Sequence, residues 1–306
     1  MSGRSPGRYK LVAIDMDGTL LSNRGEVTPR TKAAIHRCLS AGILICFATG
    51  RNWTESQVVL DAVEHYASAV FAGGAMVVDT KRQVLLHRMM MGPDLARAVC
   101  GHLEAEGHAV LALQDTEAAG VDYLVTGDAP VNEATSQWMG VTHATIRRVP
   151  RLALHTHEHT VRVGIVAGRD AVHRSMRSLA AAFEGRIVQQ SLYVPAYAVE
   201  VLEVFDFAVN KWEGVLHVAR RHGIAPAEIV AIGDDVNDLP MLQNAGLGVA
   251  MGNGRPEAKA AAKRVIGSNA DDGLALFLEE LVDQHRVEPL AEVEAGAQAR
   301  QERGSK

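Results

Sequence analysis

The chain of 306 residues contains little cysteine, few aromatic side chains and no excess of positive charge. Its three cysteines, Cys38, Cys46 and Cys100, do not have the spacing of a metal site, and their small number argues against a disulfide framework. No apolar run reaches the length of a membrane span. The formal net charge of −5 argues against a surface that binds nucleic acid through bulk charge. We therefore expect a cytoplasmic protein with buried thiols and with no membrane or nucleic-acid partner.

Apolar residues are plentiful, at 47% of the chain, and the length suggests about two domains. Residues 1–82 and 190–306 alternate strand-like and helix-like segments, which predicts a discontinuous α/β core with a parallel sheet. From about Gln83 onward, strands and helices mix in α+β order, so we expect an inserted domain at residues 83–189. Residues 286–306 are polar and rich in Ala, Glu and Arg, and we expect them to form a flexible tail.

The most informative segment follows the apolar run Leu11–Ile14, which predicts a buried strand. Asp15 and Asp17 come directly after this run, and Gly18 lets the chain turn and present N–H groups to an anion. In an open parallel sheet, ligands bind beyond the carboxyl ends of the strands. Two carboxylates beside exposed amides at such a place suit a divalent cation together with a phosphate. A solvated strand end is the alternative that this motif alone leaves open.

Two further segments carry residues that phosphate binding needs. The apolar run from Ile43 to Ala48 ends at Thr49 and Gly50, whose polar groups could bind phosphate oxygens or cap a helix. Lys211 follows another apolar stretch and opens a helical pattern, so it is either a solvated surface charge or a charge placed against a phosphate.

A third strand-like run, from Ile229 to Ile232, leads into Asp234, Asp235, Asn237 and Asp238. Hard oxygen ligands of this kind suit Mg²⁺, although an acidic loop that caps the next helix is the alternative. Because the carboxyl ends of parallel strands meet at one edge of a sheet, we expect all these groups to share one crevice. Phosphoryl transfer needs such an arrangement of nucleophile, metal and positive charge.

Taken together, these four segments resemble the four motifs of the haloacid dehalogenase superfamily of phosphohydrolases. The resemblance is to its Cof-type branch, class IIB, which carries a large α/β cap, and it extends from Lys10 to Glu280. It implies a Rossmann-like, doubly wound parallel sheet as the catalytic core and an α+β cap inserted into it. It also implies Mg²⁺-dependent hydrolysis of a small phosphate ester through an aspartyl-phosphate intermediate.

The resemblance further implies a role for each motif residue. Asp15 would be the nucleophile and Asp17 the general acid and base, while Thr49 and Lys211 would complete the catalytic set. The expected phosphate-binding residues, which lie at the strand ends, are Gly18, Thr49, Gly50, Lys211 and Asn237. The expected residues of the Mg²⁺ site are Asp15, Asp17 through its backbone carbonyl, Asp234 and, from a second layer, Asp238.

The chain departs from the family pattern at three places outside the core motifs. Gly73 stands where members of the family often carry Asn, Trp212 stands where Gly is usual after the motif lysine, and Gly254 stands where Ala is usual. We expect the first two to affect the choice of substrate more than the activity. Because the inserted domain carries no chemical motif of its own, we expect its side chains to select the leaving group.

The leading hypothesis is a phosphatase for a small soluble metabolite, most of all a sugar phosphate, that acts as a monomer or a homodimer. The alternatives are a phosphatase of a flavin- or pyridoxal-pathway phosphate and a phosphomutase. A phospho-accepting receiver domain uses similar residues, but such domains are much shorter and need no cap.

A histidine-rich stretch suggests a second metal site. Residues 155–159 place three histidines at alternate positions, so an extended segment would bring them to one face. Zinc binds imidazole triads, but no matching ligands occur elsewhere in a recognisable motif. The sequence therefore favours a solvated loop or an edge strand here.

Overall fold

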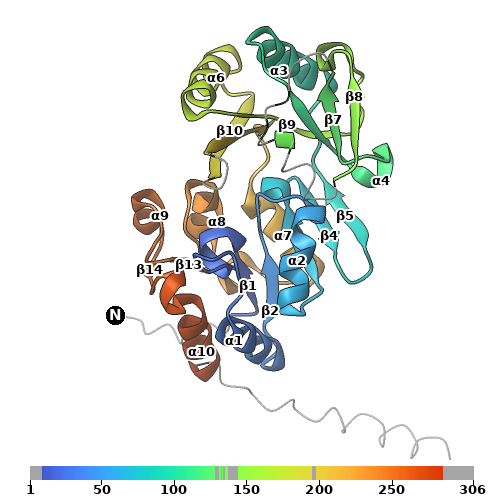
Figure 1. Cartoon of the computed structure of the whole chain (residues 1–306). Coiled ribbons are helices and arrows are strands. Elements are labelled where there is room, and N and C mark those ends of the chain that lie inside the picture. Colours follow the sequence, from blue (N-terminus) through green and yellow to red (C-terminus); the bar gives the residue numbers. More distant parts are fainter. Residues whose placement is uncertain are drawn as a thin grey trace, which may run out of the picture.

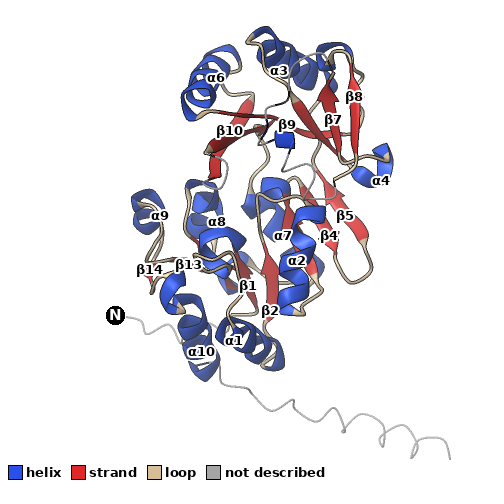
Figure 2. Cartoon of the chain, viewed as in Figure 1, coloured by secondary structure: helices blue, strands red, loops and turns tan. Residues whose placement is uncertain are grey.

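The computed structural model describes residues 9–127, 131, 133, 135–136, 144–194 and 198–284. Its described strands form a five-stranded, a six-stranded and a three-stranded sheet. In Figure 1 the six-stranded sheet and its helices occupy the upper part of the molecule, and the five-stranded sheet lies in the lower part. Helices cover the sheets in both parts (Figure 2).

The five-stranded sheet is entirely parallel and has β1 next to its centre. β1 pairs with β12 on one side and with β2 on the other, and its four residues are completely buried. The strand order is β14 (Arg264–Val265), β13 (Leu247–Ala250), β12 (Ile229–Gly233), β1 (Leu11–Ile14) and β2 (Leu44–Phe47). The predicted parallel core is confirmed, and it brings three motif-bearing strand ends to one edge.

Helices pack on both faces of this sheet, as a doubly wound fold requires. Val12 and Ile14 of β1 belong to the apolar cluster that contains Ile35 of α1, whereas Leu11 and Ala13 face the cluster of α7 and α8. The helices of this part are α1 (Pro29–Ser40), α2 (Trp53–Val63), α7 (Lys211–Arg221), α8 (Leu239–Asn244), α9 (Pro256–Ala261) and α10 (Gly273–Gln284).

A small antiparallel sheet follows β2 in the chain and consists of β3 (Ser68–Phe71), β4 (Met76–Asp79) and β5 (Val84–Arg88). A parallel bridge between Ala48 and Val70 joins its first strand to the end of β2. Gly74, in the turn between β3 and β4, has a positive φ of 112°, and a Cβ there would lie 2.0 Å from the carbonyl oxygen of Asn210. This close approach brings the turn against the start of α7.

The six-stranded sheet is antiparallel except between its last two strands, and helices cover one of its faces. Its order is β10 (Ile187–Val194), β11 (Val199–Asp206), β9 (Thr160–Ala167), β6 (Leu111–Gln114), β7 (Tyr123–Thr126) and β8 (Ile146–Val149). Its helices are α3 (Pro93–Ala105), the short α4 (Thr116–Ala119) and α6 (Arg169–Ala182). This part has the α+β character expected of the insertion, and we call it the cap.

The cap sheet extends further along the chain than we expected. The boundary placed after residue 189 falls inside β10, which pairs with β11 along its whole length, up to Asp206. The alternating apolar residues of β11 suit the half-buried strand of a cap sheet as well as a core strand, so sequence alone did not distinguish the two. We therefore propose that the cap ends after Asp206. The tail expected at residues 286–306 lies outside the described residues.

The structure describes the three cysteines and the apolarity of the helices, about which the composition led to expectations. Cys38, Cys46 and Cys100 are all free and buried. Burial raises the pKa of the Cys38 thiol to about 11 and that of the Cys46 thiol to about 12, so both stay protonated at neutral pH. Within the part of the chain that the structure describes, no helix is long and apolar enough to cross a membrane.

Candidate active site

The motif residues meet at the carboxyl edge of the parallel sheet. Asp15 follows β1, Thr49 comes two residues after β2, and Asp234 follows β12. Lys211 is the first residue of α7, whose N-terminus is capped by the side chain of Asn210. Three strands and one helix therefore hold the site, as the sequence predicted.

Lys211 lies between two carboxylates. Its Nζ is 2.5 Å from Oδ1 of Asp15 and 2.6 Å from Oδ1 of Asp238, and its side chain is 1% exposed. Burial alone would lower the pKa of Lys211, but Asp15 and Asp238 raise it above its usual range. Lys211 is therefore a buried ammonium paired with two acids and not a solvated surface residue.

Asp238 supports this lysine and the loop after β12. It is completely buried, and its Oδ2 accepts hydrogen bonds from the backbone N–H groups of Asp234, at 2.9 Å, and Asp235, at 3.0 Å. Its Oδ1 contacts Lys211. Because both oxygens are engaged, Asp238 is suited to position Lys211 and the loop, in keeping with a place in the second layer.

Three carboxylates lie close enough together to hold a metal ion. Both oxygens of Asp238 accept hydrogen bonds, whereas the side-chain bonds described for Asp15 and Asp234 involve only Oδ1 of each. Ligand atoms of Asp15, Asp234 and Asp238 lie within 4.8 Å of one another. Burial raises the pKa of Asp15 well above its usual range, against the opposing effect of Lys211. Burial also raises the pKa of Asp234 to about 6. A cluster of buried carboxylates is relieved by a bound divalent cation, and oxygen donors suit Mg²⁺, so this donor set fits the expected metal.

The turn Met16–Leu20 fits closely around Asp234. Gly18 has a positive φ of 81°, and a Cβ on it would lie 2.3 Å from Oδ2 of Asp234. Thr19 donates a hydrogen bond of 2.9 Å to Oδ1 of Asp234, and Asn253 donates one of 2.8 Å to the carbonyl oxygen of Gly18. Glycine is required here because the carboxylate occupies the space that a side chain would fill.

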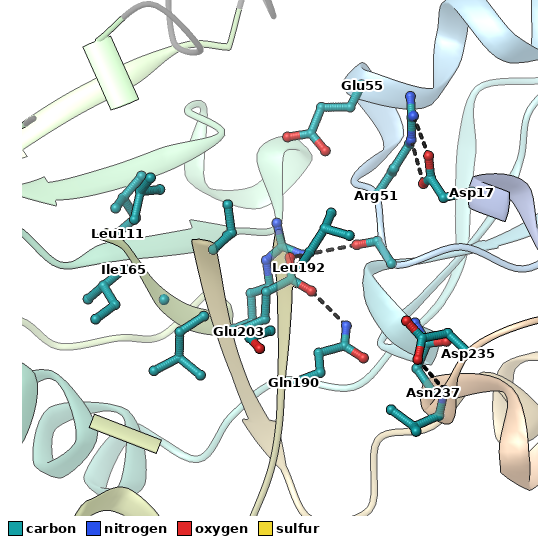
Figure 3. Close-up of a pocket in the computed structure, with 18 of the residues that line it drawn as sticks. Asp17, Arg51, Glu55, Leu111, Ile165, Gln190, Leu192, Glu203, Asp235 and Asn237 are labelled. Carbon is teal, nitrogen blue, oxygen red and sulfur yellow. Dashed lines mark hydrogen bonds and ion pairs between the residues drawn. The ribbon is translucent and has the colours of Figure 1, made fainter. Parts of the chain in front are cut away.

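Asp17 does not point toward the metal cluster but pairs with Arg51. Arg51 donates two hydrogen bonds to its carboxylate, from Nε to Oδ2 at 2.8 Å and from Nη2 to Oδ1 at 2.6 Å. The carboxylate of Asp17 is thus held by a guanidinium from the loop after β2, as Figure 3 shows. The metal role expected of Asp17 involves its backbone carbonyl, whereas both oxygens of its side chain accept hydrogen bonds from Arg51.

Thr49 and Gly50 form the base of the site. Thr49 is completely buried, its N–H donates to the carbonyl oxygen of Val70, and its Oγ1 accepts from the N–H of Arg51 at 3.1 Å. Gly50 lines a cavity above it, and Asn237 lines the same cavity with its Oδ1 3.4 Å from Nζ of Lys211. Of the predicted phosphate-binding residues, Gly18, Gly50 and Asn237 thus line one cavity, with Lys211 next to Asn237 and Thr49 adjoining Gly50.

The cavity joins the motif residues to the cap. Its volume is about 380 Å³, and Asp15, Asp17 and Asp234 line its lower end. Cap residues line the upper end, including the apolar side chains of Leu111, Leu192 and Val201. In Figure 3, Leu111 of a cap strand lies on the opposite side of the view from Asp17 and Asp235 of the core loops. A small ligand in this cavity would touch both parts of the molecule.

Several polar residues of the cavity were not predicted from the sequence. They are Arg51, Glu55, Tyr123, Arg162, Gln190 and Glu203. Arg51 could have been found, because it directly follows the Thr49–Gly50 motif. The others come from strands and a helix without a motif, and only the pairing of β9, β10 and β11 brings most of them together.

The departures from the family pattern have structural counterparts. A Cβ at Gly73 would lie 3.3 Å from the ring of Phe205, a cap residue of β11 that is 2% exposed. The ring thus fills the space beside the glycine. Trp212 is buried in the apolar cluster that includes residues of α7 and β1.

The histidine-rich stretch does not have the arrangement of a metal site. The ring nitrogens of buried His157 contact Oγ1 of Thr160 at 2.8 Å and the carbonyl oxygen of Leu152 at 2.7 Å. Because both nitrogens of this central histidine have protein partners, neither is free for a metal. The prediction of a solvated loop or an edge strand is wrong for His157, which lies in a loop but is only 1% exposed.

Comparison with known proteins agrees with this geometry. The family model of the haloacid dehalogenase-like hydrolases matches residues 12–278. A 5-amino-6-(5-phospho-D-ribitylamino)uracil phosphatase of Bacillus subtilis, YitU, is 29% identical over 272 residues, which are 88% of this chain and 96% of that protein. An HMP-PP phosphatase of Cronobacter sakazakii is 26% identical over 283 residues, 91% of this chain and 98% of that protein.

The fold of this chain also matches that of solved structures. A structure described as a HAD subclass IIB sugar phosphatase superposes with a TM-score of 0.72 at 20% identity, covering 89% of this chain and 98% of that one. At this identity the likeness concerns the fold, in which core and cap are both present. The resemblance inferred from the motifs is confirmed: the chain belongs to the haloacid dehalogenase-like hydrolase family.

Proposed function

We propose that the protein is a Mg²⁺-dependent phosphatase that hydrolyses a small phosphorylated metabolite, a sugar phosphate in the first place, through an aspartyl-phosphate. The observation that carries this proposal is the contact of Lys211 with Asp15 at the floor of a cavity that Asp17 also lines. A buried carboxylate beside a fixed ammonium and a second acid has the parts that phosphoryl transfer to a side chain needs.

In the first half-reaction, we assign the attack on phosphorus to Oδ2 of Asp15, because Lys211 already holds Oδ1. The bond from Asp15 to phosphorus forms as the ester bond breaks, and Asp17 donates a proton to the departing oxygen. When bound between Asp15 and Asp234, Mg²⁺ would neutralise charge on the phosphate. Lys211 would balance the remaining negative charge around Asp15.

In the second half-reaction, Asp17 takes a proton from a water molecule that attacks the aspartyl-phosphate. The phosphorus–oxygen bond to Asp15 breaks, inorganic phosphate leaves, and the Asp15 carboxylate is restored. Arg51 orients the Asp17 carboxylate through both of its oxygens, and one of these hydrogen bonds must open for Asp17 to carry the proton that it donates in the first step and takes back from water in the second.

The cavity supports a substrate of small size. A volume of about 380 Å³ is near the lower end of the range usual for ligand pockets and suits a monomeric metabolite better than a polymer. The cap provides both apolar and polar groups opposite the reacting carboxylates, as recognition of a hydroxylated carbon skeleton requires. We propose that the enzyme works in the cytoplasm, in keeping with its free cysteines, as a monomer or a homodimer.

A phosphatase of a flavin-pathway intermediate is a second candidate, favoured by the name of the relative YitU, with which the chain shares 29% identity. The two candidates differ in the leaving group and not in the chemistry. A phosphomutase would also use Asp15, but it would return the phosphoryl group to the substrate without releasing phosphate.

The experiment is an assay of phosphate release across sugar phosphates, a flavin-pathway phosphate and pyridoxal phosphate, with Mg²⁺ and with a chelator. The proposal expects release that requires Mg²⁺ and ranks sugar phosphates first. Conversion of one sugar phosphate to an isomer without accumulation of phosphate would identify a mutase instead. Release that a chelator does not diminish would contradict the metal requirement.

A further inference from the structure

The leaving-group end of the cavity has a charge pattern of its own. Among the described residues that line the cavity, the cationic side chains are Arg51 and Arg162, while Glu55, Glu203 and Asp235 add carboxylates beyond those of the reaction centre. Arg51 is already paired with Asp17. Arg162 is therefore the remaining cationic side chain of the lining that an anionic group of the substrate could contact.

Arg162 is fully engaged with protein groups. Its side chain is 8% exposed and forms an ion pair with Glu203. Nη1 donates to the carbonyl oxygen of Gly50 at 2.9 Å, and Nη2 donates to the hydroxyl of Tyr123 at 3.1 Å. This arginine ties the cap strand β9 to the loop after β2 and fixes Glu203. It is a positioning residue, and its charge is already balanced.

Glu203 lies close to Gly50 and lines the same cavity as Asp15. A Cβ at Gly50 would lie 3.4 Å from Nε2 of Gln190 and 3.8 Å from Oε2 of Glu203, and Gln190 donates a hydrogen bond of 2.7 Å to that same oxygen. Gly50 adjoins Thr49, around which the phosphoryl group would bind. The first atoms of the leaving group would therefore meet this carboxylate and amide.

We infer that Glu203 is a specificity-determining residue that accepts a hydrogen bond from a hydroxyl or amino group of the leaving group and rejects a leaving group with a second anionic charge. This inference rests on the proposed phosphatase function and deepens it. Arg162 offsets only one of the two carboxylates near it, Glu203 and Glu55, so one negative charge is left over and opposes a second anion, whereas a donor finds a charged acceptor in Glu203.

The inferred substrate is thus a phosphomonoester of a neutral or cationic polyol. The apolar side chains of Leu111, Leu192 and Val201 would pack against its carbon skeleton. Bisphosphates and phosphorylated sugar acids would be excluded, because the lining offers no unpaired cation among the residues described.

The test compares glycerol 2-phosphate with 2-phosphoglycerate, which differ by a hydroxymethyl group in place of a carboxylate on the carbon that bears the ester. Each is measured as a competitive inhibitor of p-nitrophenyl phosphate hydrolysis with Mg²⁺, which works whether or not it is itself hydrolysed. We expect the wild-type enzyme to bind glycerol 2-phosphate at least about tenfold more tightly. Equal inhibition constants, stronger inhibition by 2-phosphoglycerate or no inhibition by either compound would overturn the inference.

The variant Glu203→Gln tests the residue. It should bring the two inhibition constants to within about threefold, because loss of the negative charge strengthens binding of the carboxylate compound and weakens binding of the hydroxyl compound. The matched control is Glu184→Gln, which removes the same charge from an exposed position of the cap that does not line the cavity, and should keep the wild-type ratio. An unchanged ratio in Glu203→Gln would count against the role of Glu203.

Two readouts separate the possible failures. If wild-type enzyme does not hydrolyse p-nitrophenyl phosphate with Mg²⁺, the proposed function fails, and the inference fails with it. If hydrolysis occurs but the two inhibitors bind alike, only the inference fails. The wild-type comparison stands even if loss of the Glu203 partner destabilises Arg162 in the variant, which a melting curve would reveal.

Discussion

Arg51 holds the carboxylate of Asp17 through two parallel hydrogen bonds, from Nε at 2.8 Å and from Nη2 at 2.6 Å. The two residues follow different strands of the parallel sheet, so their pairing also joins the loop after β1 to the loop after β2. A bidentate pair of this kind fixes direction as well as distance. We regard Arg51 as the group that aims the proposed acid and base at the leaving oxygen.

Replacement of Arg51 should therefore affect catalysis through Asp17. We expect Arg51→Gln to lower kcat about ten- to a hundredfold, because a misdirected proton donor loses most of its advantage. Arg24→Gln, on an exposed loop, should leave kcat unchanged. The check is steady-state kinetics on p-nitrophenyl phosphate, and an unaltered kcat in Arg51→Gln would show that the pair is structural.

Asp17→Asn should slow both half-reactions, since an amide can neither give nor take the proton. General acid–base catalysis is worth about 10²- to 10⁴-fold, and we expect a loss in that range. An activated leaving group such as p-nitrophenol depends less on proton donation, so Asp17→Asn should slow the first half-reaction less than the second. The phosphoenzyme should therefore accumulate. Acid quenching followed by mass spectrometry of the peptide that contains Asp15 would detect it, and steady-state turnover equal to wild type would be inconsistent with the assigned role.

Lys211→Met should destabilise the protein as well as inactivate it. The substitution leaves Asp15 and Asp238 buried without their shared cation, and breaking a buried ion pair on one side costs about 3–5 kcal/mol. Urea unfolding in the absence of metal measures the loss. The control Lys81→Met, at an exposed turn, should change the free energy of unfolding by less than about 0.5 kcal/mol, and a similar small change for Lys211→Met would contradict the buried arrangement.

Gly18→Ala tests the fit of the turn around Asp234. A methyl group there would overlap Oδ2 of Asp234, so the carboxylate must move, and we expect Mg²⁺ affinity to fall at least about tenfold. Gly25→Ala is the matched control, because Gly25 also has a positive φ, of 74°, but no atom lies within 4 Å of its added Cβ. Both variants carry the same backbone strain.

A titration of melting temperature with Mg²⁺ distinguishes the two glycine variants, since a ligand that binds the folded state raises stability in proportion to its affinity. The stabilisation should be kept in Gly25→Ala and largely lost in Gly18→Ala. Equal stabilisation of both would mean that Asp234 is not part of the metal site.

The core of this site could be predicted from the sequence because strand, turn and charge are encoded locally. The apolar run before Asp15 specifies a buried strand, and a parallel sheet then brings Asp15, Thr49 and Asp234 to one edge without further information. The place of Lys211 at the start of α7 likewise follows from its position after an apolar run.

The cap side of the cavity could not be predicted in the same way. Arg162 and Glu203 meet only because β9 pairs with β11, and nothing near either residue in the sequence indicates the other. Long-range strand pairing also places β10 and β11 in the cap sheet, so the cap extends beyond the boundary that we expected after residue 189. The sequence also did not predict the orientation of the Asp17 side chain. The motif gives the position of Asp17 in the chain, but the direction of its carboxylate depends on the contact with Arg51.

The most direct test of the account concerns Asp15 itself. Phosphate release from p-nitrophenyl phosphate would be measured for the wild-type protein and for Asp15→Asn, each with Mg²⁺ and with a chelator. The account predicts release by the wild type only with Mg²⁺ and none by Asp15→Asn, because an amide cannot accept the phosphoryl group. Metal-dependent release by a folded Asp15→Asn variant would contradict the aspartyl-phosphate mechanism.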